Sequence, residues 1–315
     1  MTATVITRQD LEHQIALSQA TAADPVNGLF GPNSVIWRVD REAALFLGAG
    51  RALLLQLAHP WIAAAIADHS SSMMDPIGRF HRTFSIMFSI VFGTLDQALA
   101  AARKLHERHA RTSGVIRESV GPFPRGSSYL ANELNALRWV SATLTETSLV
   151  AYGLVLPPLS EQERECYYAE SKTLAALFGI PPTLLPDDWK TFMVYNEQMW
   201  KSDVLTVTPI ARAIADRIMW QRSRWPRIPK WYRALTALSL PPPVREGFKL
   251  PYGSAEQKSA ENSLNWIRRL YPVLPGGIRF VGPYHEAVGR LSGRPRPNFT
   301  TQALNRFWIG RSALV

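Results

Sequence analysis

Apolar residues recur at three- and four-residue spacing along most of this 315-residue chain, and most clearly between residues 40 and 68. This spacing puts apolar side chains on one stripe of a helix, and that stripe must be buried against other helices. Alternation of β-branched and polar residues, which marks a half-buried strand, is nearly absent. The sequence therefore predicts roughly ten helices, no convincing strand and an all-α fold.

Helix start and stop signals divide the chain into these helices. Residues 94–97 form a capping box for a helix reaching about Thr112, and residues 160–163 form a second one for a helix ending at Gly179. Further helix starts are expected at Asn132, Thr208 and residues 254–257. Linkers are short and Pro-rich and no internal repeat is present, which favours a single domain with a loosely packed tail after residue 289.

Composition narrows the class of protein further. Hydrophobic residues make up 46% of the chain and charged residues 19%, which favours a globular protein over a disordered one. The lone cysteine, Cys166, excludes an internal disulfide framework and a cysteine-rich zinc site. The net charge is +10, with 28 Arg against 7 Lys. Guanidinium groups bind acidic partners well, so the excess of arginine is consistent with such a partner. A GC-rich genome explains the excess of arginine equally well.

No targeting or membrane-spanning segment is evident. The first ten residues are polar and mixed, without the apolar stretch of an export signal. The most apolar stretch, residues 43–67, is broken by Arg51 and His59, and residues 84–92 are fewer than the about 20 that a bilayer requires. We therefore expect a soluble cytoplasmic protein, with peripheral membrane contact left open.

Several common catalytic motifs are missing from the chain. Residues 48–50 lack the third glycine and the preceding strand of a dinucleotide-binding loop, and neither a nucleophile elbow nor a phosphate-binding loop is present. His106 and His109 do not have the spacing of a zinc-protease motif, and no glutamate lies three residues before any histidine. These absences argue against the common hydrolase, kinase and non-haem iron classes.

Cationic side chains precede an apolar run in the middle of the chain. Arg79, Arg82 and Thr83 stand at positions i, i+3 and i+4, so one helix face presents two cations and a hydroxyl group. Residues 84–92, which follow, are strongly apolar. Cations beside an apolar wall suit an anion with an apolar body, and an iron porphyrin with its two propionates fits that description.

Histidines gather in the same part of the sequence. His106 and His109 share one face of the next helix, and an all-α protein without cysteine ligands would hold haem through a histidine. Structural explanations stand beside this one. The arginine face fits a solvated surface paired with acids, and the two histidines fit a basic exposed helix. His59, at the edge of an apolar helix, fits a hydrogen-bonded core histidine.

Short motifs follow one another in a consistent order between about residues 28 and 245. They lie at residues 28–38, 51–60, 68–70, 75–83, 109–114, 139–144, 167–171 and 179–182. In this order they resemble the MpaB/rubber-oxygenase (latex-clearing-protein) catalytic domain family. Each motif is weak by itself, and their succession is what makes the resemblance specific.

The resemblance implies a fold and a chemistry. The fold is an all-α, single multi-helix domain, a globin-like haem-binding helical bundle. It consists of an N-terminal extension at residues 1–27, the catalytic domain at 28–245, and a helical and irregular C-terminal extension at 246–315 packed on the same domain. The implied chemistry uses haem b and dioxygen to cleave carbon–carbon double bonds of isoprenoid molecules.

The resemblance also assigns roles to single residues. His109 is implied to be the proximal iron ligand, and His106 on the same helix face is the alternative. Arg79, Arg82 and Thr83 are implied to form the distal catalytic face. Arg82 stands where rubber oxygenases have a lysine. An arginine side chain stays charged and is a poor iron ligand. We therefore expect Arg82 to lie at the cofactor and to donate hydrogen bonds to oxygen bound there.

Two positions depart from the family pattern. Ala63 stands, by spacing, where rubber oxygenases carry a glutamate that acts as a base. Ser141 stands where many members have a histidine. Whether double-bond cleavage persists without that glutamate is left open by the sequence, whereas oxygen activation by a haem iron does not require it.

Two functions from different classes follow. The first is a haem-dependent oxygenase or oxidase acting on a small hydrophobic substrate, such as a prenylated molecule, in a pocket lined by residues 84–92. The second is a protein that binds haem or an apolar ligand without turnover. A third interpretation, binding of nucleic acid or an anionic membrane, rests on Trp, Tyr, Arg and Lys interleaved at residues 217–233. Inward-packed aromatic residues explain that segment better, so we expect no nucleic-acid partner. The oligomeric state stays open.

Overall fold

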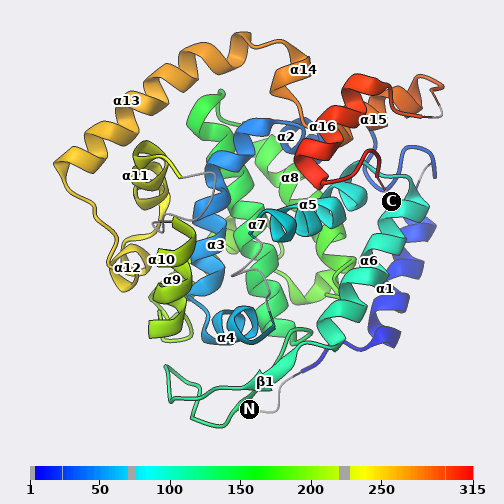
Figure 1. Ribbon diagram of the computed structural model, residues 1–315. Helices are drawn as coiled ribbons and strands as arrows, with labels where there is room; N and C mark the ends of the chain where they lie inside the picture. Colours follow the sequence, from blue (N-terminus) through cyan, green and yellow to red (C-terminus); the bar gives the residue numbers. More distant parts are fainter. Residues whose placement is uncertain (1–3, 23, 70–75, 220–227, 295, 315) are drawn as a thin grey trace.

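The structure, a computed structural model, describes residues 4–22, 24–69, 76–219, 228–294 and 296–314 (Figure 1). Within these residues the α-helices are α1 (Arg8–Thr21), α2 (Val35–Asp40), α3 (Ala49–Leu57), α4 (Pro60–His69), α5 (Pro76–Phe92), α6 (Leu95–Ala110), α7 (Leu134–Val155), α8 (Glu161–Ala176), α9 (Trp189–Lys201), α10 (Pro209–Met219), α11 (Lys230–Ser239), α12 (Pro242–Gly247), α13 (Ser254–Leu270), α14 (Gly276–Arg279), α15 (Gly282–Leu291) and α16 (Phe299–Ile309). The all-α class is confirmed, with more helices than expected.

Short 3₁₀ helices and one small hairpin complete the described structure. The 3₁₀ helices are η1 (Ala43–Gly48), η3 (Pro182–Leu184) and η4 (Tyr271–Val273). The strands β1 (Ser113–Val115) and β2 (Ser128–Leu130) pair antiparallel. The expectation of no strand was wrong here, because strands of three residues are too short to show an alternating pattern in the sequence.

A glycine in β1 allows the two strands of the hairpin to pack closely. Gly114 pairs with Tyr129, and a Cβ atom at residue 114 would collide with the Tyr129 hydroxyl group. That hydroxyl donates to Asp68 Oδ2 at 2.8 Å and so ties the hairpin to α4. Gly114→Ala is expected to lower the free energy of unfolding by about 1–3 kcal/mol, the usual cost of overpacking.

Urea denaturation measures this effect. Val115→Ala is the matched control, because Val115 is adjacent and exposed, and such substitutions stay within about 0.5 kcal/mol. Equal stabilities of the two variants would show that the collision is relieved at no cost.

The two predicted capping boxes, each made by residues three positions apart, are confirmed. Thr94 and Ser160 each form a complete capping box at the start of α6 and α8. Asn132 was wrongly predicted as the cap of α7, since the Glu133 carboxylate accepts the Ala136 N–H instead. The predicted ends also shift slightly: α8 stops at Ala176, three residues before Gly179.

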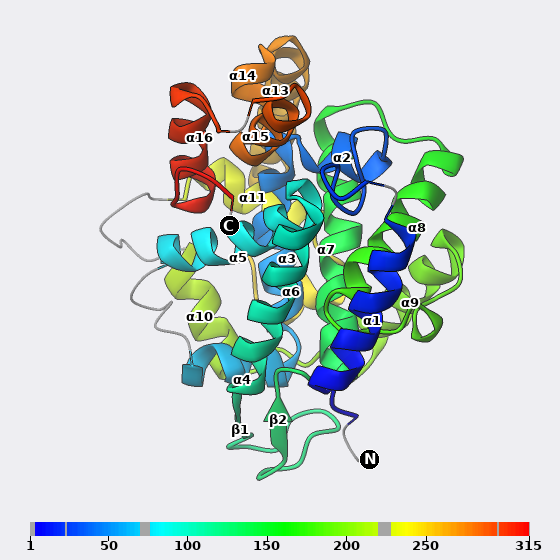
Figure 2. The ribbon, with the colours of Figure 1, turned by 90° about the vertical axis from the view of Figure 1, so that its right-hand side faces the viewer.

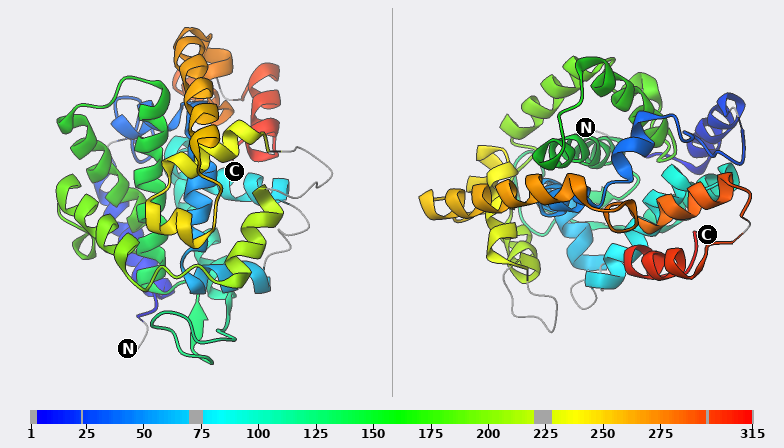
Figure 3. Two further views of the ribbon diagram at one scale, coloured as in Figure 1. Left: turned by 90° about the vertical axis from the view of Figure 1, so that its left-hand side faces the viewer. Right: turned by 90° about the horizontal axis from the view of Figure 1, so that it is seen from above.

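The long helix α7 lies in the middle of the molecule and contacts η1, α2, α3, α8 and α13 (Figure 1). One core cluster joins α1, α2, α5, α6 and α8, and a second joins α3, α4, α9, α10 and α12. The outer helix α13 packs on α11 at the edge of the bundle (Figure 3). The helices that bear the predicted site are therefore held by the first cluster.

The C-terminal tail is packed, contrary to expectation. Helix α16 contacts α5 and α15, and His81 Nε2 lies 3.0 Å from the Phe307 carbonyl oxygen. Arg290 donates to the Phe92 carbonyl at 2.8 Å. In the sequence, arginines that bind the backbone carbonyl groups of another helix look the same as arginines of an unpacked basic tail. No helix among the described residues is long and apolar enough to cross a membrane.

Candidate functional site

The predicted cationic face lies on the first two turns of α5. Arg79 is half-buried, whereas Arg82 and Thr83 are exposed. Burial lowers the pKa of Arg79, and the neighbouring charge of Arg82 lowers it further. This end of α5 therefore carries two positive charges close together.

The two predicted histidines lie on the last turns of α6. Burial is the main cause that lowers the pKa of His109 to about 4, and the charges of Arg108 and His106 add to it. The His109 imidazole is therefore neutral at pH 7 and keeps a lone pair that a metal ion can use. Burial also lowers the pKa of His106.

The surroundings of the two rings differ although they share a helix face. His106 is buried, and the charges that act on it come from Glu107 of α6 and from Arg8, Asp10 and Glu12 around α1. The charges that act on His109 come only from Arg108 and His106 of α6 itself. His106 therefore lies near α1, and no charge of α1 acts on His109.

Asn132 lies between the two histidines, a role that the sequence did not indicate. Its Nδ2 atom is 3.3 Å from His106 Nδ1 and donates to the His106 carbonyl oxygen at the same distance. Its side chain also hydrogen-bonds to His109 and raises the pKa of that ring, as expected if a ring N–H donates to the amide oxygen. Orientation by a second residue is typical of metal-binding histidines.

The cationic face and the histidines lie on two helices that diverge. From the turn at residues 93–94, α5 runs across the view and α6 runs down it in Figure 2. Both groups lie away from that turn, on the two arms. The structure thus places them toward the far ends of two adjoining helices. Among the described residues, no cluster of three or more His, Cys, Asp or Glu side chains could hold a metal ion.

An apolar cavity of about 100 Å³ lies beside the C-terminal half of α5. Four residues of α5 line it, as expected for the run at 84–92: Phe84, Met87, Phe88 and Val91. The rest of its wall comes from α2, η1, α3, α7 and α8. None of the five predicted site residues is among its lining residues.

A comparison with family models decides the relationship that the motifs indicated. Residues 37–272 match the family described as ER-bound oxygenase mpaB/B′/rubber oxygenase, catalytic domain. The chain belongs to this family. Its description names oxygenases, so the chain is an enzyme of the oxygenase class by family. No curated protein and no solved structure matches the chain.

Two positions that the motif comparison singled out, Ala63 and Ser141, are packed in the core. Ala63 of α4 is 0% exposed and belongs to the second core cluster. Ser141 of α7 is also buried. At residue 63 the core is therefore filled by a methyl group, and α4 presents no carboxylate there.

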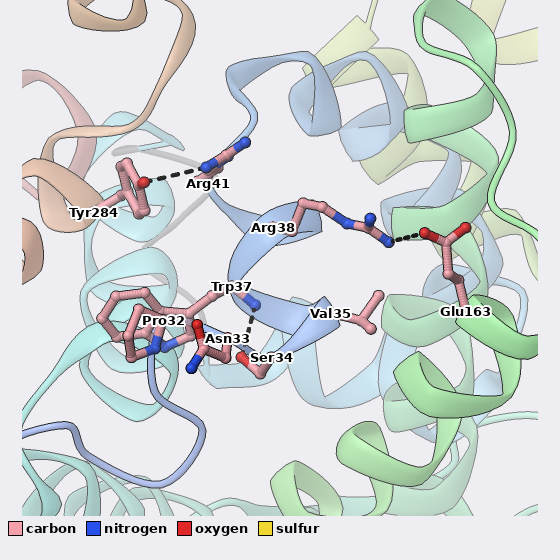
Figure 4. A pocket seen from close by; sticks show the side chains of 9 residues that line it. All are labelled: Pro32, Asn33, Ser34, Val35, Trp37, Arg38, Arg41, Glu163 and Tyr284. Carbon is pink, nitrogen blue, oxygen red and sulfur yellow. Dashed lines mark hydrogen bonds and ion pairs between the residues drawn. The ribbon is translucent and has the colours of Figure 1, made fainter.

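A larger hollow of about 270 Å³ opens at the surface between α2, α8 and α15 (Figure 4). Its two cations point away from each other. Arg38 pairs with Glu163 at 2.6 Å, and Arg41 donates to the Tyr284 hydroxyl group at 3.1 Å. These arginines join three helices, and they do not converge on a common anion.

Two further predictions concern structural histidines and aromatics. His59 is 3% exposed and accepts a hydrogen bond from the Trp61 N–H at 3.3 Å, so it is a core histidine.

Of the aromatic and basic segment at 217–233, residues 220–227 lie outside the described residues. Tyr232 accepts from the Gly50 N–H and donates to the Phe46 carbonyl, which is inward packing as expected.

Proposed function

We propose that this oxygenase-family chain is a haem b-dependent oxygenase or oxidase that acts on a small hydrophobic substrate, such as a prenylated or isoprenoid molecule. The observation that carries the proposal is His109: a neutral imidazole, oriented by Asn132, on the helix adjoining a cationic face. Dioxygen is the co-substrate, and oxidative cleavage of a carbon–carbon double bond is the reaction that the family implies.

The residues present fit a haem group. Iron held by side chains alone needs several protein ligands, and the described residues offer no such cluster. A haem iron needs a single proximal histidine, because the macrocycle supplies its other nitrogens.

Each side chain then has a defined task. His109 holds the iron, while Asn132 fixes the orientation of its ring. Haem, when bound, supplies the activation of dioxygen that side chains cannot. Arg79, Arg82 and Thr83 would form the catalytic face, where Arg82 would donate N–H groups to dioxygen and Thr83 would offer a hydroxyl group.

The packed position at Ala63 favours one alternative, a protein that binds haem or an apolar ligand without turnover. Oxygen uptake separates the two functions. The haem-loaded protein is offered prenylated and terpenoid alcohols, with haem-free protein as the control. Uptake that requires both haem and substrate, with oxygenated products by mass spectrometry, is expected for the oxygenase. Haem binding with no uptake for the whole series would favour the alternative.

A further inference from the structure

The apolar cavity beside α5 has one carboxyl group in its described lining. Its walls are mostly aromatic and aliphatic, with Phe46 packed on Phe84 at 4.6 Å between ring centroids. Asp40, at the C-terminal end of α2, also lines it, together with Tyr167 and Ser148. A carboxyl group among apolar walls is costly to place unless something interacts with it.

The hydrogen bonds around Asp40 leave part of that carboxyl group unused. The Tyr167 hydroxyl donates to Asp40 Oδ1 at 3.1 Å, and Ser148 hydrogen-bonds to Tyr167 in turn. The nearby Glu170 is occupied, because it accepts the N–H groups of Val35 and Ile36 at the start of α2. Within the described part of the chain, Asp40 Oδ2 has no hydrogen-bond partner.

We propose that this cavity binds a small neutral molecule with an apolar body and one hydroxyl group, which donates its hydrogen bond to Asp40 Oδ2. The site is separate from Arg79, Arg82, Thr83 and the histidines, none of which lines it. The inference goes beyond the proposed function, because it concerns a second ligand site whose occupation does not depend on haem.

Size and charge select the ligand class. At about 100 Å³ the cavity is far too small for a porphyrin. It is somewhat smaller than an apolar cavity of ~150 Å³ that binds benzene, so a ligand about the size of a single small ring is the upper limit. The charged side chain in the described lining is a carboxyl group rather than a cation, which disfavours an acidic ligand. A neutral donor avoids the desolvation cost of burying an ammonium ion beside it.

The ionisation of Asp40 supports the same conclusion. Burial raises the pKa of Asp40 to about 7, and the charge of Glu170 contributes, while the Tyr167 hydrogen bond opposes the shift. The described cavity-lining residues of α5 and α7 that face it carry no charge. A donated hydrogen bond stabilises the carboxylate, so a hydroxylic ligand is expected to bind more tightly at pH 8 than at pH 6.

Calorimetric titration of the purified protein with phenol and toluene tests the proposal. The two probes have nearly the same shape, and toluene lacks the donor. Both are expected to bind, and Asp40→Asn is expected to weaken phenol about tenfold or more while leaving toluene unchanged, since a hydrogen bond to a charged group is lost. Ala52→Leu, which fills the cavity, is expected to abolish binding of both.

The outcomes are distinct. Failure of both probes to bind, or an equal effect of Asp40→Asn on both, would overturn the proposal. Tighter binding of benzylamine than of phenol would overturn the choice of a neutral ligand. Folding of the variants is checked by circular dichroism; Asp40→Asn removes a charge that burial disfavours and should fold. Because binding is measured without turnover, a protein that binds phenol but no haem would contradict the proposed function and not this inference.

Discussion

The proposed haem site predicts that replacing His109 with alanine abolishes the absorption band of the haem-supplemented protein. His109 lies on the last turn of α6, and burial keeps its ring neutral and able to bind iron. Loss of a residue that merely orients a ligand costs about 10–100-fold in metal affinity, so loss of the ligand itself should cost more. Absorption spectra of the haem-supplemented wild type and variant measure the effect.

His106→Ala is the matched control. His106 lies three residues away on the same helix, and its ring faces the charges around α1. Alanine favours the helix at either position, so circular dichroism should show both variants folded. The His106 variant is expected to keep the band. A band that disappears in the His106 variant and persists in the His109 variant would reverse the assignment of the ligand.

A buried ion pair between α3 and α7 should give the largest change in stability. Arg51 is 2% exposed, and its Nη2 atom lies 2.9 Å from Glu146 Oε1. It also donates to the Thr147 hydroxyl and the Ser239 carbonyl. Arg51→Met leaves the Glu146 carboxylate buried and unpaired, and is expected to cost about 3–5 kcal/mol of unfolding free energy.

Two comparisons isolate the charge as the cause. Urea denaturation should show most of the stability restored in Arg51→Met/Glu146→Met, because an apolar pair of similar volume often replaces a buried ion pair at little cost. Burial already raises the pKa of Glu146, and loss of Arg51 would raise it more. The penalty of Arg51→Met should therefore shrink as pH falls from 7 to 5 and Glu146 takes up a proton. A penalty unchanged by pH and by the second substitution would indicate lost packing instead.

The part of the fold that the sequence predicted is the part set by local chemistry. The capping boxes at Thr94 and Ser160 use residues three positions apart, so the signal and the structure coincide. The cap of α7 was misassigned because Asn132 is used for contact with the histidines of α6. Nothing in the sequence distinguishes an asparagine that caps its own helix from one that serves another.

The candidate site shows the same limit. Spacing correctly indicates that His106 and His109 share a helix face, but only the packing of α1 on α6 shows how their surroundings differ. Asp40 was not predicted because its importance comes from burial. Its signal, one of two acids together with Glu42 in the stretch at residues 35–55, also fits an ordinary exposed turn.

Haem titration of the purified wild-type protein, followed by absorption, tests the central claim most directly. The account predicts saturable binding of one haem per chain, with a Soret band that shifts when the protein is reduced under carbon monoxide. Absorption that increases linearly with added haem, without saturation and without a carbon monoxide complex distinct from free haem, would contradict it.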